Sequence, residues 1–143
     1  MISHSAMRWA VGFAFALCAC GVKPDEKSGD DQERHKAKPI KLGEAVSDSI
    51  SYKDGDRTDW KVVETPDAGF LTVLVSLDDP KQEVLVALFD RYGKPVARQL
   101  HRKDDESPAI QLITQAVPGR YFVMVQAAQE STKTGYGLKV SLQ

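Results

Sequence analysis

The two cysteines of the chain, Cys18 and Cys20, are the residues whose type and spacing most directly suggest chemistry. Two thiols one residue apart can bind a metal, exchange electrons, form a disulfide or mark a processing site. A zinc site needs about four ligands, but the three histidines of the chain, His4, His35 and His101, are scattered along it. A disulfide between Cys18 and Cys20 would close a very tight, strained ring. The pair therefore favours a processing signal.

Residues 1–21 have the composition of a secretory signal peptide. A short polar start ends in Arg8, the uncharged run Trp9–Leu17 follows, and small residues close the segment. The apolar run is too short for a comfortable membrane span. The alternative is a buried N-terminal helix of the domain, but the strongly polar segment that comes next would separate such a helix from any core.

Within this segment, Leu17-Cys18-Ala19-Cys20 resembles the lipobox of bacterial lipoproteins. The resemblance implies cleavage before Cys20 and acylation of its thiol and freed amine, so residues 1–19 are expected to be removed. Several acyl chains would then attach the protein stably to a membrane. Gly21 stands where inner-membrane lipoproteins of enteric bacteria carry Asp, which favours the outer membrane. We therefore expect a lipid-anchored protein of the bacterial cell envelope.

The second candidate site is an acidic turn. Asp54, Asp56 and Asp59 surround a glycine in the stretch DGDRTD, and three carboxylates around a turn can bind calcium through their oxygens. The spacing of an EF-hand is absent because no Glu occupies the twelfth position of the loop. The alternative is a turn whose aspartates cap local backbone groups. Calcium at these three aspartates is the only cofactor that the sequence suggests.

Catalysis is not expected. After residue 39 the chain has one histidine, His101, in the stretch HRKDDESP, which the sequence predicts to be an exposed loop. No serine lies in a nucleophile-elbow pattern. Asp104 and Asp105 are consecutive, and such carboxylates in a loop are usually solvated rather than tuned for acid–base chemistry. We therefore predict that the protein is not an enzyme.

Composition limits the possible partners. The chain has 143 residues, a net charge of -1 and 27% charged residues, an ordinary mixture for one globular domain. A net charge near zero gives no strong attraction to nucleic acid, so no nucleic-acid partner is expected. Residues 20–39 are rich in both basic and acidic side chains and poor in apolar ones. This stretch is predicted to be a flexible linker that begins with the lipidated Cys20.

Residues 40–143 are predicted to form one β-sandwich domain. About eight short runs are predicted to be strands. Most alternate apolar and polar residues with a period of two, as in the stretch FLTVLVSL at residues 70–77, whereas residues 83–90 (EVLVALFD) are nearly all apolar, as expected of a strand buried on both faces or at the centre of a sandwich. Turn residues separate the runs at intervals of about ten residues. This pattern is typical of an all-β, antiparallel, jelly-roll-like sandwich. The large side chains in the runs are expected to pack in the core: Trp60, Phe70, Phe89, Tyr121 and Phe122.

Several of these runs resemble the bacterial pre-peptidase C-terminal (PPC) domain, a small β-sandwich often appended to secreted proteases. Asp59-Trp60-Lys61-Val62 is similar to the Asp-x-aromatic strand of the family, and residues 86–94 (VALFDRYGK) are similar to its apolar strand that ends in Asp and a glycine turn. Residues 118–125 (PGRYFVMV) and 135–138 (GYGL) are similar to its two last strands. The resemblance covers about residues 42–142 and implies the sandwich fold.

Together these predictions describe a lipid-anchored, non-catalytic envelope lipoprotein whose sandwich binds a protein partner in an envelope or surface assembly. The alternative is a module that binds carbohydrate, matrix protein or calcium, as the PPC resemblance implies. An exposed row of aromatic side chains would favour the alternative, and the candidates for such a row are Tyr52, Tyr92 and Tyr136.

Overall fold

The computed structural model describes residues 29–143, so the predicted signal peptide and Cys20 lie outside the described residues. A short 3-10 helix and nine strands follow one another along the chain: η1 (Arg34–Lys36), β1 (Lys38–Pro39), β2 (Ala45–Ser51), β3 (Thr58–Thr65), β4 (Gly69–Leu77), β5 (Val84–Phe89), β6 (Pro95–His101), β7 (Ala109–Ala116), β8 (Gly119–Ala127) and β9 (Lys133–Leu142). Among these described residues, no helix is long and apolar enough to cross a membrane.

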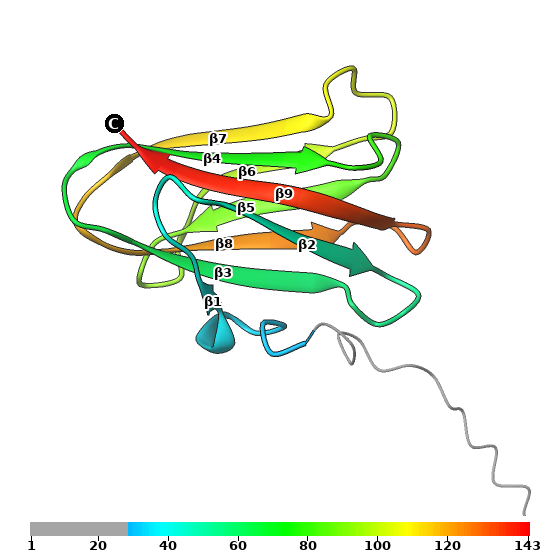
Figure 1. Ribbon diagram of the computed structural model, residues 1–143, viewed down its shortest axis with the longest axis horizontal. Helices are drawn as coiled ribbons and strands as arrows, with labels where there is room; N and C mark the ends of the chain where they lie inside the picture. The colour runs from blue at the N-terminus through cyan, green and yellow to red at the C-terminus, as the bar shows by residue number, and fades with distance from the viewer. Residues whose placement is uncertain (1–28) are drawn as a thin grey trace, which may run out of the picture.

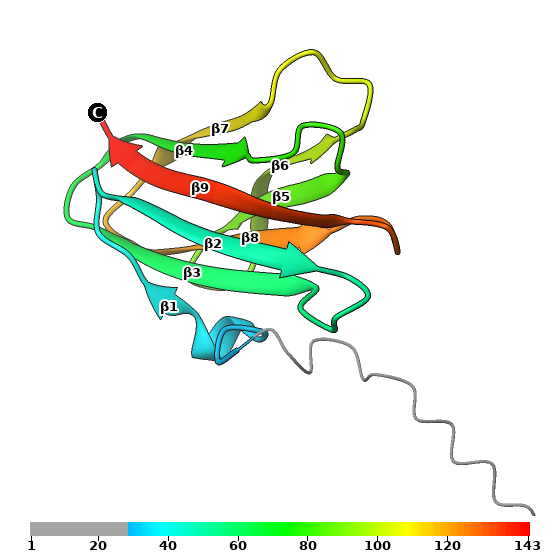
Figure 2. The same cartoon turned by 45° about the vertical axis from the view of Figure 1, so that its right-hand side comes forward.

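Two sheets pack face to face, as Figures 1 and 2 show. One sheet has the strand order β1-β3-β8-β5-β6, and the other has the order β2-β9-β4-β7. The eight long strands pair antiparallel and follow the strand order of a jelly roll. The predicted all-β antiparallel sandwich is confirmed, and each of the eight predicted runs corresponds to one of the strands β2 to β9.

The core lies between the two sheets and consists of the inward-facing residues of the alternating runs. Leu71, Val73 and Val75 of β4 are fully buried, and they share one apolar cluster with Val86 and Leu88 of β5. Successive side chains of a strand point to opposite faces, so residues two apart enter the same interior. Removing this apolar surface from water is the main stabilising contribution to the fold.

The large aromatic side chains divide between the core and the outer faces. Tyr121 is buried, and its hydroxyl oxygen accepts a backbone hydrogen bond. Trp60 and Phe89 are half-buried, and their ring centroids lie 5.1 Å apart. The prediction that Phe70 packs in the core is wrong, because this side chain is 59% exposed. Leu71 takes the inward position of β4, and the alternation of the strand turns its neighbour Phe70 outward.

The last part of the predicted linker packs against the sandwich, which differs from the flexible segment expected over residues 20–39. β1 runs parallel to β3 along the edge of the sheet. The backbone N–H of Trp60 donates to the carbonyl of Asp31 (2.8 Å), and the N–H of Ile40 donates to the carbonyl of Val62 (2.9 Å). These backbone hydrogen bonds and the ion pair between Asp31 and Lys61 offset the entropy of ordering a polar segment.

η1 lies next to the outer face of the five-stranded sheet. The guanidinium of Arg34 stands over the ring of Phe122, 5.5 Å from its centroid. The same guanidinium packs on Gly93 of the β5–β6 turn, where a Cβ would lie 1.7 Å from Nη1. Gly93 also has a φ of +82°, a conformation that favours glycine. The segment before β1 is therefore held at both its backbone and its side chains.

Candidate functional site

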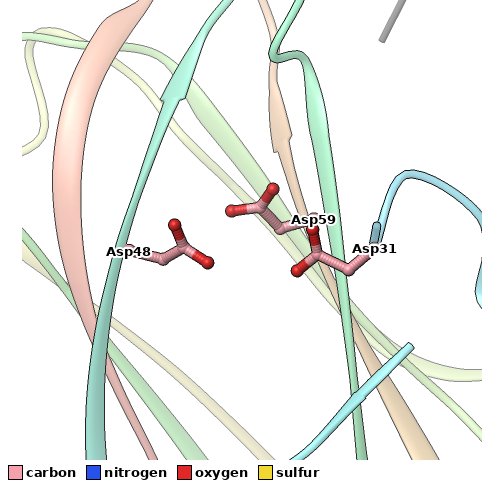
Figure 3. Close-up of side chains that lie close together, drawn as sticks. All are labelled: Asp31, Asp48 and Asp59. Carbon is pink, nitrogen blue, oxygen red and sulfur yellow. The ribbon is translucent and has the colours of Figure 1, made fainter. Parts of the chain in front are cut away.

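Five polar side chains meet at the edge of the sandwich where β2, β3, β9 and the N-terminal segment approach one another. We call this group the ionic cluster: Asp31, Asp48, Asp59, Lys61 and Tyr136. Figure 3 shows that its three carboxylates converge from the N-terminal segment, β2 and β3. One oxygen of each lies within 4.8 Å of an oxygen of each of the others. Three acids this close require positive charge or protonation to coexist.

Lys61 supplies that positive charge from β3. Its ammonium donates hydrogen bonds to Asp31 Oδ2 (2.5 Å) and to Asp48 Oδ2 (2.6 Å), and its side chain is only 4% exposed. Burial alone would lower the pKa of Lys61, but the hydrogen bonds to the two carboxylates raise it above its usual value. Lys61 therefore stays protonated between the two carboxylates.

Asp59 and Tyr136 form the inner half of the cluster. The Tyr136 hydroxyl donates to Asp59 Oδ2 (2.5 Å). Burial, together with the nearby charges of Asp48 and Asp31, raises the pKa of Asp59 to about 7, although the hydrogen bond from Tyr136 opposes the change. Burial and the negative charge of Asp59 also raise the pKa of Tyr136. Tyr136 therefore stays protonated, while Asp59 titrates near neutral pH.

Asp48 and Asp31 form the outer half. Burial alone would raise the pKa of Asp48, but hydrogen bonds from Lys61 and from the backbone N–H of Ser49 lower it. Asp31 is fully buried, and its Oδ1 accepts no hydrogen bond within the described residues. The ammonium of Lys38 lies 3.5 Å from that oxygen. Asp31 thus forms ion pairs with two lysines, the buried Lys61 of β3 and the half-exposed Lys38 of β1.

This geometry suits holding the segment in place rather than catalysis. A hard cation prefers carboxylate oxygens, but Asp31 and Asp48 already accept short bonds from Lys61, so a metal would have to displace the ammonium. Removing one partner of a buried ion pair is strongly destabilising, because the other charge stays buried. The cluster therefore acts as an ionic lock between the N-terminal segment and the sandwich.

The predicted calcium ligands are only partly brought together. Asp59 belongs to the ionic cluster, whereas the group of metal-capable side chains within residues 29–143 includes neither Asp54 nor Asp56. Asp54 Oδ2 accepts a hydrogen bond from the Ser51 hydroxyl (2.7 Å) and lies 3.4 Å from the ammonium of Lys133. Asp56 pairs through its backbone with Ser51. Calcium at Asp54, Asp56 and Asp59 stays a prediction.

His101 does not lie in the exposed loop that the sequence predicted. It ends β6 and is buried, and its two ring nitrogens lie 3.1 Å from the carbonyl oxygen of Gln82 and 2.9 Å from that of Ser107. The loop itself, residues 102–108, is exposed. The imidazole of His101 therefore links Gln82, which lies just before β5, to Ser107, which lies just before β7. Each ring nitrogen faces one backbone carbonyl.

Sequence reasoning missed Asp31, Asp48 and Lys61 as site residues. Lys61 stands two positions from Asp59 and two from the buried Val63, so the period of the β3 run already placed all three on one face. Asp31 carried no such signal, because its partners are distant in the sequence.

The surface holds a second feature, an exposed apolar half of the sandwich. All seven exposed large apolar side chains of residues 29–143 belong to β4, β6, β7 or the turns next to them: Phe70, Leu74, Tyr92, Val96, Leu100, Ile113 and Val117. β7 lies at one side of Figure 1 and β1 at the other, so the exposed apolar residues of β4 and β7 are remote from β1. We call these seven residues the apolar surface.

The three candidate tyrosines do not form an exposed row. Tyr92 is 78% exposed and belongs to the apolar surface. Tyr136 is buried in the ionic cluster, and Tyr52 is half-buried under the guanidinium of Arg57, which lies 3.9 Å from its ring centroid. The predicted row of three exposed tyrosines is therefore not formed among residues 29–143.

Comparison with known proteins identifies the fold. No protein-family model and no curated protein sequence matches the chain. The pre-peptidase C-terminal domain of a collagenase from Bacillus anthracis is similar in structure, with a TM-score of 0.62 and 20% identity over 73% of this chain and 94% of that one. CorA, a surface-associated copper-binding protein of Methylomicrobium album, has a TM-score of 0.54 and 6% identity over 75% of this chain and 98% of that one. At these identities the likeness shows a PPC-like β-sandwich fold.

Proposed function

We propose that the protein is a lipid-anchored, non-catalytic lipoprotein of the bacterial cell envelope, whose sandwich binds a protein partner through the apolar surface. The single observation that carries this proposal is the distribution of exposed apolar side chains. Seven of them belong to β4, β6, β7 or the turns next to these strands, while on the opposite side the N-terminal segment covers the β3 edge of the five-stranded sheet. Phe70, Leu74 and Ile113 lie close together on the outer face of the four-stranded sheet, and exposed apolar groups gathered on one face are a mark of interaction sites.

The position of the N-terminal segment supports an orientation away from the membrane. If Cys20 is lipidated, residues 21–28 are the only span between the anchor and the packed segment, and they reach at most about 28 Å. The chain arrives at the β1 side, and the apolar surface lies on the β6 and β7 side. A partner in the envelope can therefore reach the apolar surface without displacing the anchor. The surface location named for CorA is in keeping with this proposal.

Membrane fractionation tests the anchor. Cys20→Ala should move the protein from the membrane fraction to the soluble fraction, because the acyl chains are attached at that residue. Cys18→Ala is the matched control and should stay with the membranes, since Cys18 leaves with the signal peptide. A Cys20→Ala protein that still floats with membranes would refute lipidation at this residue.

Photo-crosslinking in intact cells tests the binding surface. A photoreactive amino acid at Phe70, in the apolar surface, should give a discrete adduct with another polypeptide. The same amino acid at Ser47, an exposed position of β2 on the same sheet, is the control and should give none. Equal labelling from the two positions would show that the apolar half is not a binding surface.

A further inference from the structure

β7 is the edge strand of its sheet, and β6, the edge strand of the other sheet, lies near it. It pairs with β4 on one side and has no strand partner on the other within the described residues. Figure 1 shows it at the far side of the sandwich from β1. An edge strand presents a row of backbone N–H and C=O groups that can pair with another strand.

The other edges carry features that discourage such pairing, and β7 does not. β1 has only two residues, and β2 includes the charged Asp48. β6 begins with Pro95, includes Arg98 and has an irregular register against β5 near Leu88. β7 reads AIQLITQA, with no charge and no proline, and its pairing with β4 is regular along the strand. Natural edge strands usually avoid this combination.

We propose that two copies of the chain pair β7 to β7 in antiparallel fashion about a two-fold axis at Ile113, which joins two four-stranded sheets into one of eight strands. This inference rests on the proposed function, because it names a second copy as a partner of the apolar surface. A two-fold contact between identical chains must be complementary to itself, and the sequence of β7 meets that condition.

The pairing about Ile113 matches residues on both faces of the sheet. On the outer face Ile113 meets Ile113 of the other copy, and Gln111 meets Gln115, so apolar lies against apolar and amide against amide. On the inner face Leu112 meets Thr114, which sets a large side chain against a smaller one. A register shifted by one residue would oppose inward and outward side chains. Cross-strand pairs of these kinds stabilise antiparallel sheets.

The pairing also relieves the exposure of Ile113. This β-branched side chain is 56% exposed at the middle of the outer face of β7. A second Ile113 directly opposite would cover part of it, since cross-strand Cβ atoms lie about 4.5–5.5 Å apart.

Disulfide trapping tests the register in membranes of bacteria that express the full chain. Ile113→Cys places two thiols opposite each other, with Cα atoms about 4.5–5.5 Å apart, within the range for a disulfide. It should give a dimer under mild oxidation. Gln111→Cys alone is the matched control, because its counterpart would lie about 13 Å away, four residues along the strand. The double variant Gln111→Cys/Gln115→Cys should restore the cross-link. The unchanged chain gives the background from Cys18 and Cys20.

A second measurement does not depend on cysteine chemistry. The full-length chain with Cys18 and Cys20 replaced by Ala should sediment with twice the mass of one chain. Ile113→Lys in the same background should halve that mass by placing two like charges opposite each other. Ser47→Lys, on β2 of the same sheet, should leave the dimer intact.

Two results would overturn the proposal: a monomeric mass at every concentration, or an Ile113→Cys cross-link no stronger than that of Gln111→Cys. A monomer that still gives an adduct with a different polypeptide from position 70 would overturn self-pairing while the binding module stands. If neither a dimer nor an adduct forms, both the inference and the proposed function are wrong.

Discussion

Replacing Asp59 by Asn should remove a pH dependence that is built into the ionic cluster. Asp59 is buried beside two other carboxylates, and these surroundings raise its pKa to about 7 from the 3.8 of an ordinary aspartate. A carboxyl whose pKa is raised on folding binds more protons in the folded state than in the unfolded state. The free energy of unfolding therefore falls as the pH rises from about 4 to about 7, and the full penalty is present above that range.

The size of the effect follows from the two pKa values. Each unit of difference corresponds to about 1.4 kcal/mol, so the contribution of Asp59 to the free energy of unfolding should drop by about 2–3 kcal/mol between pH 5 and pH 8. Asp48, whose pKa is lowered, and Lys61, whose pKa is raised, titrate outside this window. Asn keeps an acceptor for the Tyr136 hydroxyl but has no charge, so Asp59→Asn should lose this drop.

Urea unfolding at pH 5 and pH 8, followed by the fluorescence of Trp60, measures the difference. The stability of Asp59→Asn relative to the wild type should increase by about 2–3 kcal/mol from the lower to the higher pH. Asp67→Asn, at an exposed turn between β3 and β4, is the matched control and should keep the wild-type dependence. If Asp59→Asn and the wild type lose stability in parallel, the account of the cluster is wrong.

Three further substitutions test the ionic cluster, the contact of Arg34 with Phe122, and the apolar core. Lys61→Met should lower the free energy of unfolding by about 3–5 kcal/mol in urea melts at pH 7, because it leaves Asp31 buried without its main partner; adding Asp31→Asn should recover part of the loss. Arg34→Ala removes the contact with Phe122, so backbone hydrogen exchange in η1 and β1 should become about two- to fivefold faster, with β4 unchanged as the internal control. Leu88→Ala should cost about 2–5 kcal/mol in the same urea melts, and a loss below 1 kcal/mol would contradict its place in the core.

The strands could be predicted from the sequence because their signal is local. Apolar alternation and turn residues located all eight long strands, and the alternation of FLTVLVSL corresponds to the burial pattern of β4. The outward turn of Phe70 was implied by the same alternation, but hydrophobicity alone suggested a core position. The burial of His101 could not be predicted, since it depends on two carbonyl groups that the fold brings to its ring.

The ionic cluster could not be predicted because it depends on distant partners. Asp31 and Lys61 are 30 residues apart, and Asp59 and Tyr136 are 77 apart. A charged stretch that binds no partner is disordered, and the same stretch with a complementary buried charge is ordered. The composition of a segment indicates only that it is charged, so it predicts disorder and gives no sign of a distant buried partner. This is why the segment that contains Asp31 was expected to be flexible and the acidic turn was expected to be the site.

The course of the N-terminal segment along β3 has a mechanical consequence. A pull on the N-terminus reaches Asp31 before it reaches any strand of the apolar core, so the Asp31–Lys61 contact and the short β1–β3 pairing are the first bonds to carry the force. Their rupture would free residues 31–40 and lengthen the connection by at most about 35 Å. The sandwich would stay folded during that extension, because β3 keeps its antiparallel pairing with β8. The ionic cluster and the β1–β3 pairing would therefore break before the strands of the core separate, so the core would not be stretched first.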